Sequence, residues 1–170
     1  MASDTGNRAA TGDRSRVGIA ECAVATDDTV LTTSGLGSCL GVALYDERAG
    51  VAGLAHVMLP RAEAADAEAE TAAKFADTGV ERLLADMEAH GADAGRVTAK
   101  LAGASKMFSF SFNEEGIGER NVEATRAVLA AHDVPVVAED VGGDSGRSLQ
   151  LRAATGELVI EHANARREIL

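Results

Sequence analysis

The chain has 170 residues, of which 46% are hydrophobic and 25% charged, and it carries a formal net charge of −11. This length and composition are typical of one globular domain. The acidic charge excludes nucleic acid as the main partner, and an anionic membrane surface as well, because each requires a basic face. No apolar run reaches the length of a membrane span or of a secretion signal, so we expect a cytoplasmic protein with no direct membrane insertion.

The N-terminal half of the chain is dominated by strand patterns. Residues 1–16 are small and polar and predict a disordered tail, followed by a domain over 17–170. Short apolar runs bounded by glycine or polar residues predict strands over 18–25, 29–33, 39–45 and 50–59. A glycine-punctuated turn at 34–38 precedes the third run, and a polar turn at 46–49 joins the last two runs into a hairpin.

The C-terminal half mixes helices with strands. Residues 61–73 are alanine-rich and acidic and predict a solvated loop or the start of a helix. Apolar residues at the helical period predict two helices, from Phe75 to His90 and from Glu119 to His132. Strands are predicted over 96–102, 134–138, 147–153 and 157–162. The fold class is therefore α/β of the α+β type, a single domain with mixed or antiparallel sheets layered with two main helices.

The predicted hairpin brings a thiol and an imidazole together. If its turn is centred between Glu47 and Arg48, Asp46 faces Ala49 and Cys39 faces His56. Directly opposed residues place their Cβ atoms about 4.5–5.5 Å apart on one face of the sheet. An imidazole at this distance can take the thiol proton, and the thiolate is the nucleophile. The alternative is that both are half-buried strand residues, since an unpaired cysteine is commonly part of a core.

The glycine-rich turn before Cys39 offers a second element of a catalytic site. Gly35, Gly37 and Ser38 bring backbone close to the substrate of Cys39, where N–H groups can stabilise an oxyanion. The turn lacks the lysine and the βαβ context of a phosphate-binding loop. Its alternative role is a tight turn that requires glycine backbone angles.

Several segments resemble one family in order along the chain. Residues 33–41 (TSGLGSCLG) and 53–60 (GLAHVMLP) resemble the signature of the CheD family. The resemblance continues through 74–78 (KFADT), 102–108 (AGASKMF), 117–124 (IGERNVEA) and 138–148 (AEDVGGDSGRS), and it spans residues 17–160. Ser34 departs from the family pattern, which has an aliphatic residue there.

The resemblance implies a protein-glutamine deamidase that acts on methyl-accepting chemotaxis receptors, with methylesterase activity in some members. It implies Cys39 as the nucleophile, His56 as the general base and Thr33 as the residue that orients the imidazole; as an alternative, Thr33 serves only as a strand former. It further implies that no cofactor is required and that the phosphatase CheC is a partner. Two other functions stay open: a regulatory module that acts by binding CheC, and a general cysteine amidohydrolase or esterase.

The remaining candidate residues have weaker signals. Cys22 is predicted to be a core residue, with a disulfide to Cys39 as the alternative, although the expected compartment keeps thiols reduced. Asn121 and Asp140 are candidates for shaping the cleft, and Asn121 is also suited to a helix start. His162 has no evident partner. No spacing of histidine, cysteine and acidic residues predicts a metal site.

Overall fold

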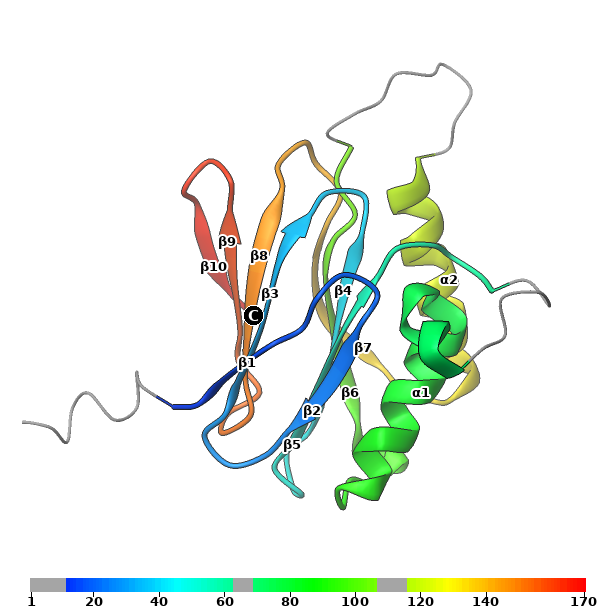
Figure 1. Cartoon of the computed structure of the whole chain (residues 1–170), viewed down its shortest axis with the longest axis vertical. Helices are drawn as coiled ribbons and strands as arrows, with labels where there is room; N and C mark the ends of the chain where they lie inside the picture. The colour runs from blue at the N-terminus through cyan, green and yellow to red at the C-terminus, as the bar shows by residue number, and fades with distance from the viewer. Residues whose placement is uncertain (1–11, 63–68, 107–115) are drawn as a thin grey trace, which may run out of the picture.

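The computed structural model describes residues 12–62, 69–106 and 116–170. The molecule has three layers: a sheet of five strands, here sheet A, a second sheet of five strands, here sheet B, and two helices that cover the outer face of sheet B (Figure 1). The predicted α+β class, with mixed sheets layered with two helices, is confirmed. Within the described ranges, neither helix has the length and apolar character that crossing a bilayer requires.

The two sheets differ in how their strands are ordered along the chain. Sheet A has the order β1 (Arg14–Arg16), β3 (Val30–Leu36), β8 (Arg147–Arg152), β9 (Leu158–His162), β10 (Arg167–Ile169). Sheet B has the order β2 (Cys22–Ala25), β5 (Val51–Val57), β4 (Leu40–Asp46), β6 (Thr98–Gly103), β7 (Val136–Val141). The pairs β1–β3 and β6–β7 are parallel, and the other pairs are antiparallel.

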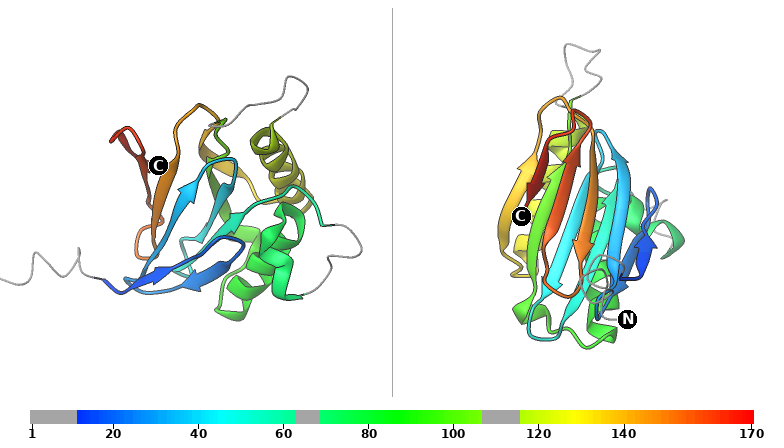
Figure 2. Two further views of the ribbon diagram at one scale, coloured as in Figure 1. Left: turned by 45° about the horizontal axis from the view of Figure 1, so that its top comes forward. Right: turned by 90° about the vertical axis from the view of Figure 1, so that its left-hand side faces the viewer.

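Burial patterns follow from this layering. Every residue of β5 is buried, because sheet B has sheet A on one face and the helices on the other. Strand β8 instead alternates buried Arg147, Leu149 and Leu151 with half-exposed residues, because one face of sheet A is open, as the right-hand view of Figure 2 shows. Two apolar cores result, one between the sheets and one between sheet B and the helices.

The helices are α1 (Ala76–Ala89) and α2 (Ile117–Ala131), and short 3₁₀ turns lie at Ala69–Lys74 and Ala94–Arg96. Helix α1 buries Val80, Leu83, Leu84 and Met87, the positions expected from its apolar period. It ends where Gly91 adopts a positive φ of 99°. Both predicted helices are therefore present, with ends shifted by one or two residues, which is within the ordinary uncertainty of helix ends.

The N-terminal prediction needs a correction. Residues 1–11 lie outside the described part of the chain, but Arg14–Arg16 form β1, which pairs in parallel with β3. The predicted tail therefore extended too far, since a backbone that hydrogen-bonds along a sheet edge needs no apolar side chains to be ordered. Strand β10 was not predicted either, and like β1 it is a short polar edge strand. In the region predicted as a loop, 63–68 are outside the described residues.

The hairpin register also differs from the prediction. Strands β4 and β5 pair Asp46 with Val51 and Gly41 with His56, so Cys39 and His56 are not directly opposed. The turn is two residues longer than expected because the Asp46 carboxylate accepts the N–H of Ala49 and the Asp46 carbonyl accepts that of Gly50. A shift of two residues equals the side-chain period of a strand, so the residues move along the sheet without changing face.

Candidate active site

A hydrogen bond between the two sheets connects Thr33 with His56. Thr33 lies on β3 of sheet A and His56 on β5 of sheet B, and Thr33 Oγ1 is 2.8 Å from His56 Nδ1. Both side chains are buried, with 3% and 0% of their surface exposed. The predicted contact between Thr33 and the second ring nitrogen is therefore present.

The partners of Thr33 determine which ring nitrogen of His56 carries the proton. The Thr33 hydroxyl donates its single hydrogen to the carbonyl of Val17 at 2.8 Å. It must therefore accept at its contact with His56, which makes Nδ1 the protonated nitrogen of the neutral ring. The Nε2 atom is buried and has no hydrogen-bond partner among the described residues, so its lone pair is free to accept a proton.

Cys39 precedes β4 and lies on the His56 side of sheet B. Gly41 faces His56 across the hairpin, and Cys39 is two residues before Gly41, one side-chain period away. Cys39 packs against the core between the sheets, whereas its neighbour Leu40 belongs to the core under the helices. Cys39 and His56 are thus diagonal neighbours on one face, a relationship with Cα atoms about 7–8 Å apart. Gly41 places no side chain between them.

The backbone before Cys39 is held by three consecutive carbonyl groups. The carbonyl of Gly37 accepts the N–H of Ser105 at 2.8 Å, and that of Cys39 accepts the N–H of Ala104 at 2.8 Å. The carbonyl between them, of Ser38, accepts a hydrogen bond of 3.0 Å from the side-chain amide of Asn121 on α2. Three separate donors therefore fix the successive peptide groups of this stretch.

This arrangement also directs the N–H groups of the stretch. In a trans peptide the carbonyl and the following N–H point in opposite directions, and the described peptide bonds are all trans. The N–H groups of Ser38 and Cys39 therefore point away from Ser105 and Asn121. In the ranges that the structure covers, neither N–H donates to a backbone or side-chain acceptor. Ser38 is exposed and Cys39 half-buried, so both N–H groups lie near the surface.

The glycine loop begins inside β3. Strand β3 extends through Ser34 and Gly35 to Leu36, into the turn predicted at 34–38, with a register shift against β8 between Thr33 and Leu36. Gly35 has a φ of 73°, a left-handed angle that favours glycine, and the N–H of Gly37 donates to its carbonyl at 3.1 Å. After the bulge, Gly37, Ser38 and Cys39 connect the end of β3 in sheet A to the start of β4 in sheet B.

Burial shifts the pKa values of both central groups toward their neutral forms. Burial raises the pKa of the Cys39 thiol above its usual value of 9.0. It lowers the pKa of the His56 imidazole below its usual value of 6.5. Near neutral pH the pair is therefore a thiol beside a neutral imidazole with a free Nε2 lone pair.

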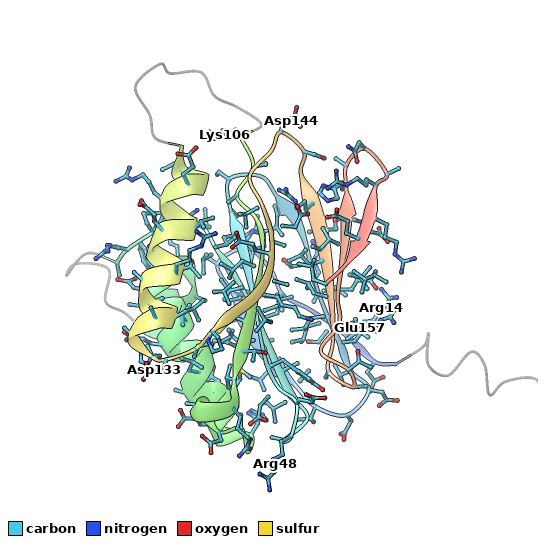
Figure 3. The ribbon with its side chains drawn as sticks, turned by 180° about the vertical axis from the view of Figure 1, so that it is seen from behind. Arg14, Arg48, Lys106, Asp133, Asp144 and Glu157 are labelled. Carbon is cyan, nitrogen blue, oxygen red and sulfur yellow. The ribbon has the colours of Figure 1, made fainter. Side chains whose placement is uncertain are left out.

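Three loops meet at the end of the molecule where β4 begins. Figure 3 labels Lys106 and Asp144 at this end, and Arg48, in the β4–β5 turn, at the opposite end. The N–H of Lys106 donates to the carbonyl of Gly143, which joins two of these loops, and Ser105 joins the glycine loop to them. A cavity of about 420 Å³ borders Gly35, Leu36 and Gly37 on this side, although Cys39 and His56 do not line it.

A buried charged cluster below these loops was missed by the sequence analysis. The Arg147 guanidinium donates to Asp140 and to the carbonyls of Gly103 and Gly142. His162 Nε2 lies 2.9 Å from Asp140 Oδ2 and 3.4 Å from Glu168 Oε2, so His162 has partners that its sequence neighbours did not reveal. Ligand atoms of Asp140, His162 and Glu168 lie within 4.8 Å of one another, but Arg147 already neutralises Asp140. The two cysteines are free, so the alternative of a disulfide is wrong.

Comparison with known proteins identifies relatives over most of the chain. A protein-family profile described as CheD chemotactic sensory transduction matches residues 58–162. A Haloarcula marismortui protein, named probable chemoreceptor glutamine deamidase CheD, is 52% identical over 154 residues, which cover 91% of this chain and 88% of that protein. The chemoreceptor glutamine deamidase CheD of Halalkalibacterium halodurans is 44% identical over 147 residues, which cover 85% of this chain and 91% of that protein.

Among solved structures, the Neisseria meningitidis protein NMB0706 matches with a TM-score of 0.49 and 12% identity, over 83% of this chain and 66% of that one. The profile match begins after Thr33, Cys39 and His56, whereas the sequence relatives match most of the chain. The resemblance inferred from the ordered motifs is thereby confirmed, and the chain belongs to the CheD family.

Proposed function

We propose that this protein is a chemoreceptor glutamine deamidase in which Cys39 is the nucleophile and His56 the general base. The observation that carries the proposal is the state of His56: Thr33 accepts the Nδ1 proton, and the buried Nε2 has no partner among the described residues. A base needs this free lone pair, and Cys39 lies on the same face of the sheet. The names of the relatives supply the substrate class.

The reaction begins with a proton transfer within the pair. His56 Nε2 takes the thiol proton of Cys39 as the sulfur attacks the side-chain carbonyl carbon of a glutamine. Because burial favours the neutral form of both groups, the resting pair is a thiol beside a neutral imidazole. The N–H groups of Ser38 and Cys39, which point away from their hydrogen-bonded carbonyls, would bind the oxyanion.

The intermediate then collapses and the enzyme is regenerated. The imidazolium gives its proton to the amide nitrogen, which leaves as ammonia, and a thioester remains on Cys39. His56 Nε2 next deprotonates a water molecule that attacks the thioester carbon, and the sulfur leaves with the returned proton. The sum is glutamine plus water giving glutamate plus ammonia, and no cofactor enters any step.

Mass spectrometry of a receptor cytoplasmic fragment incubated with this protein tests the proposal. We expect the mass gain of a glutamine-to-glutamate conversion, and we expect Cys39→Ala and His56→Ala to abolish it. Cys22→Ala is the matched control because Cys22 is the other free thiol. Cys22 pairs with Ala55, next to His56, but it packs on the helix-covered face of sheet B, opposite the face that carries His56. Conversion by the Cys39→Ala variant would refute Cys39 as the nucleophile. Turnover of free glutamine or simple esters in preference to the receptor would favour a general amidohydrolase.

Family resemblance also leads us to propose the cytoplasm as the site of action and the phosphatase CheC as a partner. Cys39→Ala should leave CheC binding intact, since binding needs no nucleophile. Binding of CheC together with no receptor deamidation by the wild-type protein would favour the regulatory-module alternative.

A further inference from the structure

The side-chain amide of Asn121 binds backbone carbonyls close in sequence to each member of the candidate catalytic pair. Asn121 lies on α2 and is 0% exposed. Its Nδ2 atom donates to the carbonyl of Ser38 and to the carbonyl of Met58, each at 3.0 Å. Two carbonyl acceptors require the NH₂ end of the amide, so the assignment of its nitrogen and oxygen follows from the partners.

The two carbonyls lie close in sequence to Cys39 and His56. The Ser38 carbonyl belongs to the peptide whose N–H is that of Cys39, and Met58 follows His56 by two residues, directly after β5 ends at Val57. One amide group therefore links the peptide plane before the nucleophile to the strand that carries the base. Because the peptide is planar, fixing its carbonyl also fixes the direction of the Cys39 N–H.

Helix α2 is held firmly against the same loop. A Cβ atom at Gly118, one turn before Asn121, would lie 2.7 Å from the carbonyl oxygen of Ala104, so the helix packs directly on that backbone. The N–H of Ala104 in turn binds the carbonyl of Cys39. Asn121 thus extends from a helix whose distance to the loop has little freedom to vary.

We propose that Asn121 is a positioning residue that aims the Cys39 N–H at the oxyanion of the tetrahedral intermediate. This inference rests on the proposed function, because it requires Cys39 to be the nucleophile. Asn121 touches neither the substrate nor the sulfur. Its amide holds the Ser38–Cys39 peptide plane in one orientation relative to the His56 strand, and losing it leaves that plane free to rotate.

Two chemical readouts separate this role from a general loosening of the site. Deamidation passes through an oxyanion, whereas alkylation of Cys39 by iodoacetamide is a direct displacement with no oxyanion. For Asn121→Asp, which keeps the shape but leaves at most one donor for the two carbonyls, we expect kcat to fall about 100-fold, as when one oxyanion donor is lost. We expect KM and the alkylation rate to stay within about threefold of wild type. All variants carry Cys22→Ala so that Cys39 is the single thiol.

Matched variants complete the experiment. Thr125 lies one turn after Asn121 on α2, is equally buried, and has an Oγ1 without a partner among the described residues. Thr125→Val should therefore keep wild-type kcat, whereas His56→Ala should lose both deamidation and alkylation. An Asn121→Asp enzyme with wild-type kcat, or one that loses both rates equally, would overturn the inference. Deamidation surviving Cys39→Ala would instead overturn the proposed function itself.

Asn121→Ala removes the donors without adding a charge and serves if the aspartate variant does not fold. A measurement on the wild-type chain needs neither variant. The side-chain amide protons of Asn121 should exchange slowly with solvent in NMR spectra, because both are buried and hydrogen-bonded. Exchange as fast as that of an exposed asparagine would show that Asn121 does not form these two hydrogen bonds.

Discussion

The hydroxyl of Thr33 and the imidazole of His56 are joined across the interface of the two sheets by a hydrogen bond of 2.8 Å. The same hydroxyl donates to the carbonyl of Val17, whose N–H in turn donates to the carbonyl of Thr32. The tautomer of the His56 ring is therefore set by Thr33 on sheet A, whereas His56 itself belongs to sheet B. The two sheets must therefore pack correctly for the Nε2 atom of His56 to be unprotonated and able to act as a base.

Replacing Thr33 tests this dependence. Thr33→Val keeps the shape but removes the acceptor for Nδ1–H, so the ring can adopt either tautomer and either orientation. We expect kcat to fall about 10–100-fold with little change in KM, since the substrate does not touch Thr33. Steady-state deamidation of a receptor fragment measures both constants.

Thr33→Ser provides the control for that loss. Serine retains an oxygen that can donate to Val17 and accept from His56, so we expect kcat within about fivefold of wild type. Equal losses in the serine and valine variants would contradict the role of the hydroxyl and would indicate a packing defect at β3 instead.

The pH dependence follows from the burial of His56. Burial lowers the pKa of His56 below 6.5, and the base must be neutral to act. The acid limb of the kcat/KM profile should therefore lie below pH 6.5. NMR titration of the imidazole in the free enzyme should give the same value. An acid limb above the ordinary histidine pKa would exclude His56 as the group that it reports.

The same shift affects stability with a definite sign. The folded state binds the His56 proton less readily than the unfolded chain does, so protonation favours unfolding. Stability should rise with pH between the lowered folded pKa and the unfolded value near 6.5, and should lose this contribution as pH falls through that window. Urea unfolding across the window measures the slope, and His56→Gln should reduce it.

Sequence patterns could predict the hairpin of β4 and β5 but not its register. The apolar runs identify both strands, because each is buried on two faces. The register depends on the Asp46 carboxylate, which caps a longer turn. The prediction that Cys39 and His56 share a face held nevertheless, since the shift equals one side-chain period.

Other features of the site could not be predicted because they depend on contacts between distant segments. The contact of Asn121 with the Ser38 and Met58 carbonyls joins a helix to two strand ends, and helical periodicity alone leaves Asn121 as a polar residue. The partner of Thr33 is a main-chain carbonyl of Val17, which carries no side-chain signal. The Arg147–Asp140–His162 cluster likewise depends on how β7, β8 and β9 are brought together.

Gly41, which pairs with His56, must be a glycine because the two sheets approach each other closely at this position. A Cβ atom at Gly41 would lie 2.3 Å from Leu149 Cδ1 and 3.3 Å from the carbonyl oxygen of Ala102. Leu149 is 1% exposed and cannot move into solvent. Gly41→Ala should therefore lower the free energy of unfolding by about 1–3 kcal/mol, measured by urea denaturation.

A second substitution identifies the clash as the cause. Leu149→Val lacks the Cδ atoms, so Gly41→Ala should cost less in that background, with a coupling energy of about 1 kcal/mol. If the two substitutions change the free energy of unfolding additively, the Leu149 side chain is not what prevents a side chain at position 41.

Asp46 should stabilise the fold without affecting catalysis. Its carboxylate is 0% exposed and accepts the N–H groups of Asp93 and Ala49 and two bonds from Arg96. Burial alone would raise the pKa of Asp46, but the hydrogen bonds from Arg96, Asp93 and Ala49 hold it below 3.8. Asp46→Asn faces these donors with an NH₂ group and should lower the free energy of unfolding by about 2–4 kcal/mol.

The pH dependence of that loss distinguishes the charge from the shape of the side chain. The folded pKa of Asp46 is lowered, so its contribution is complete above the unfolded value of 3.8 and declines as pH falls below it. The difference in the free energy of unfolding between wild type and Asp46→Asn should shrink in acid, measured by urea unfolding at neutral pH and below pH 3.8.

Two controls accompany Asp46→Asn. Asp86→Asn, which removes an exposed partner of Arg82, should lower the free energy of unfolding by less than about 1 kcal/mol. Asp46 adjoins the β4–β5 turn, at the end of the molecule opposite the loops near Cys39 (Figure 3). The folded Asp46→Asn variant should therefore have the kcat of wild type. A reduced kcat would mean that this end of the hairpin is coupled to the site.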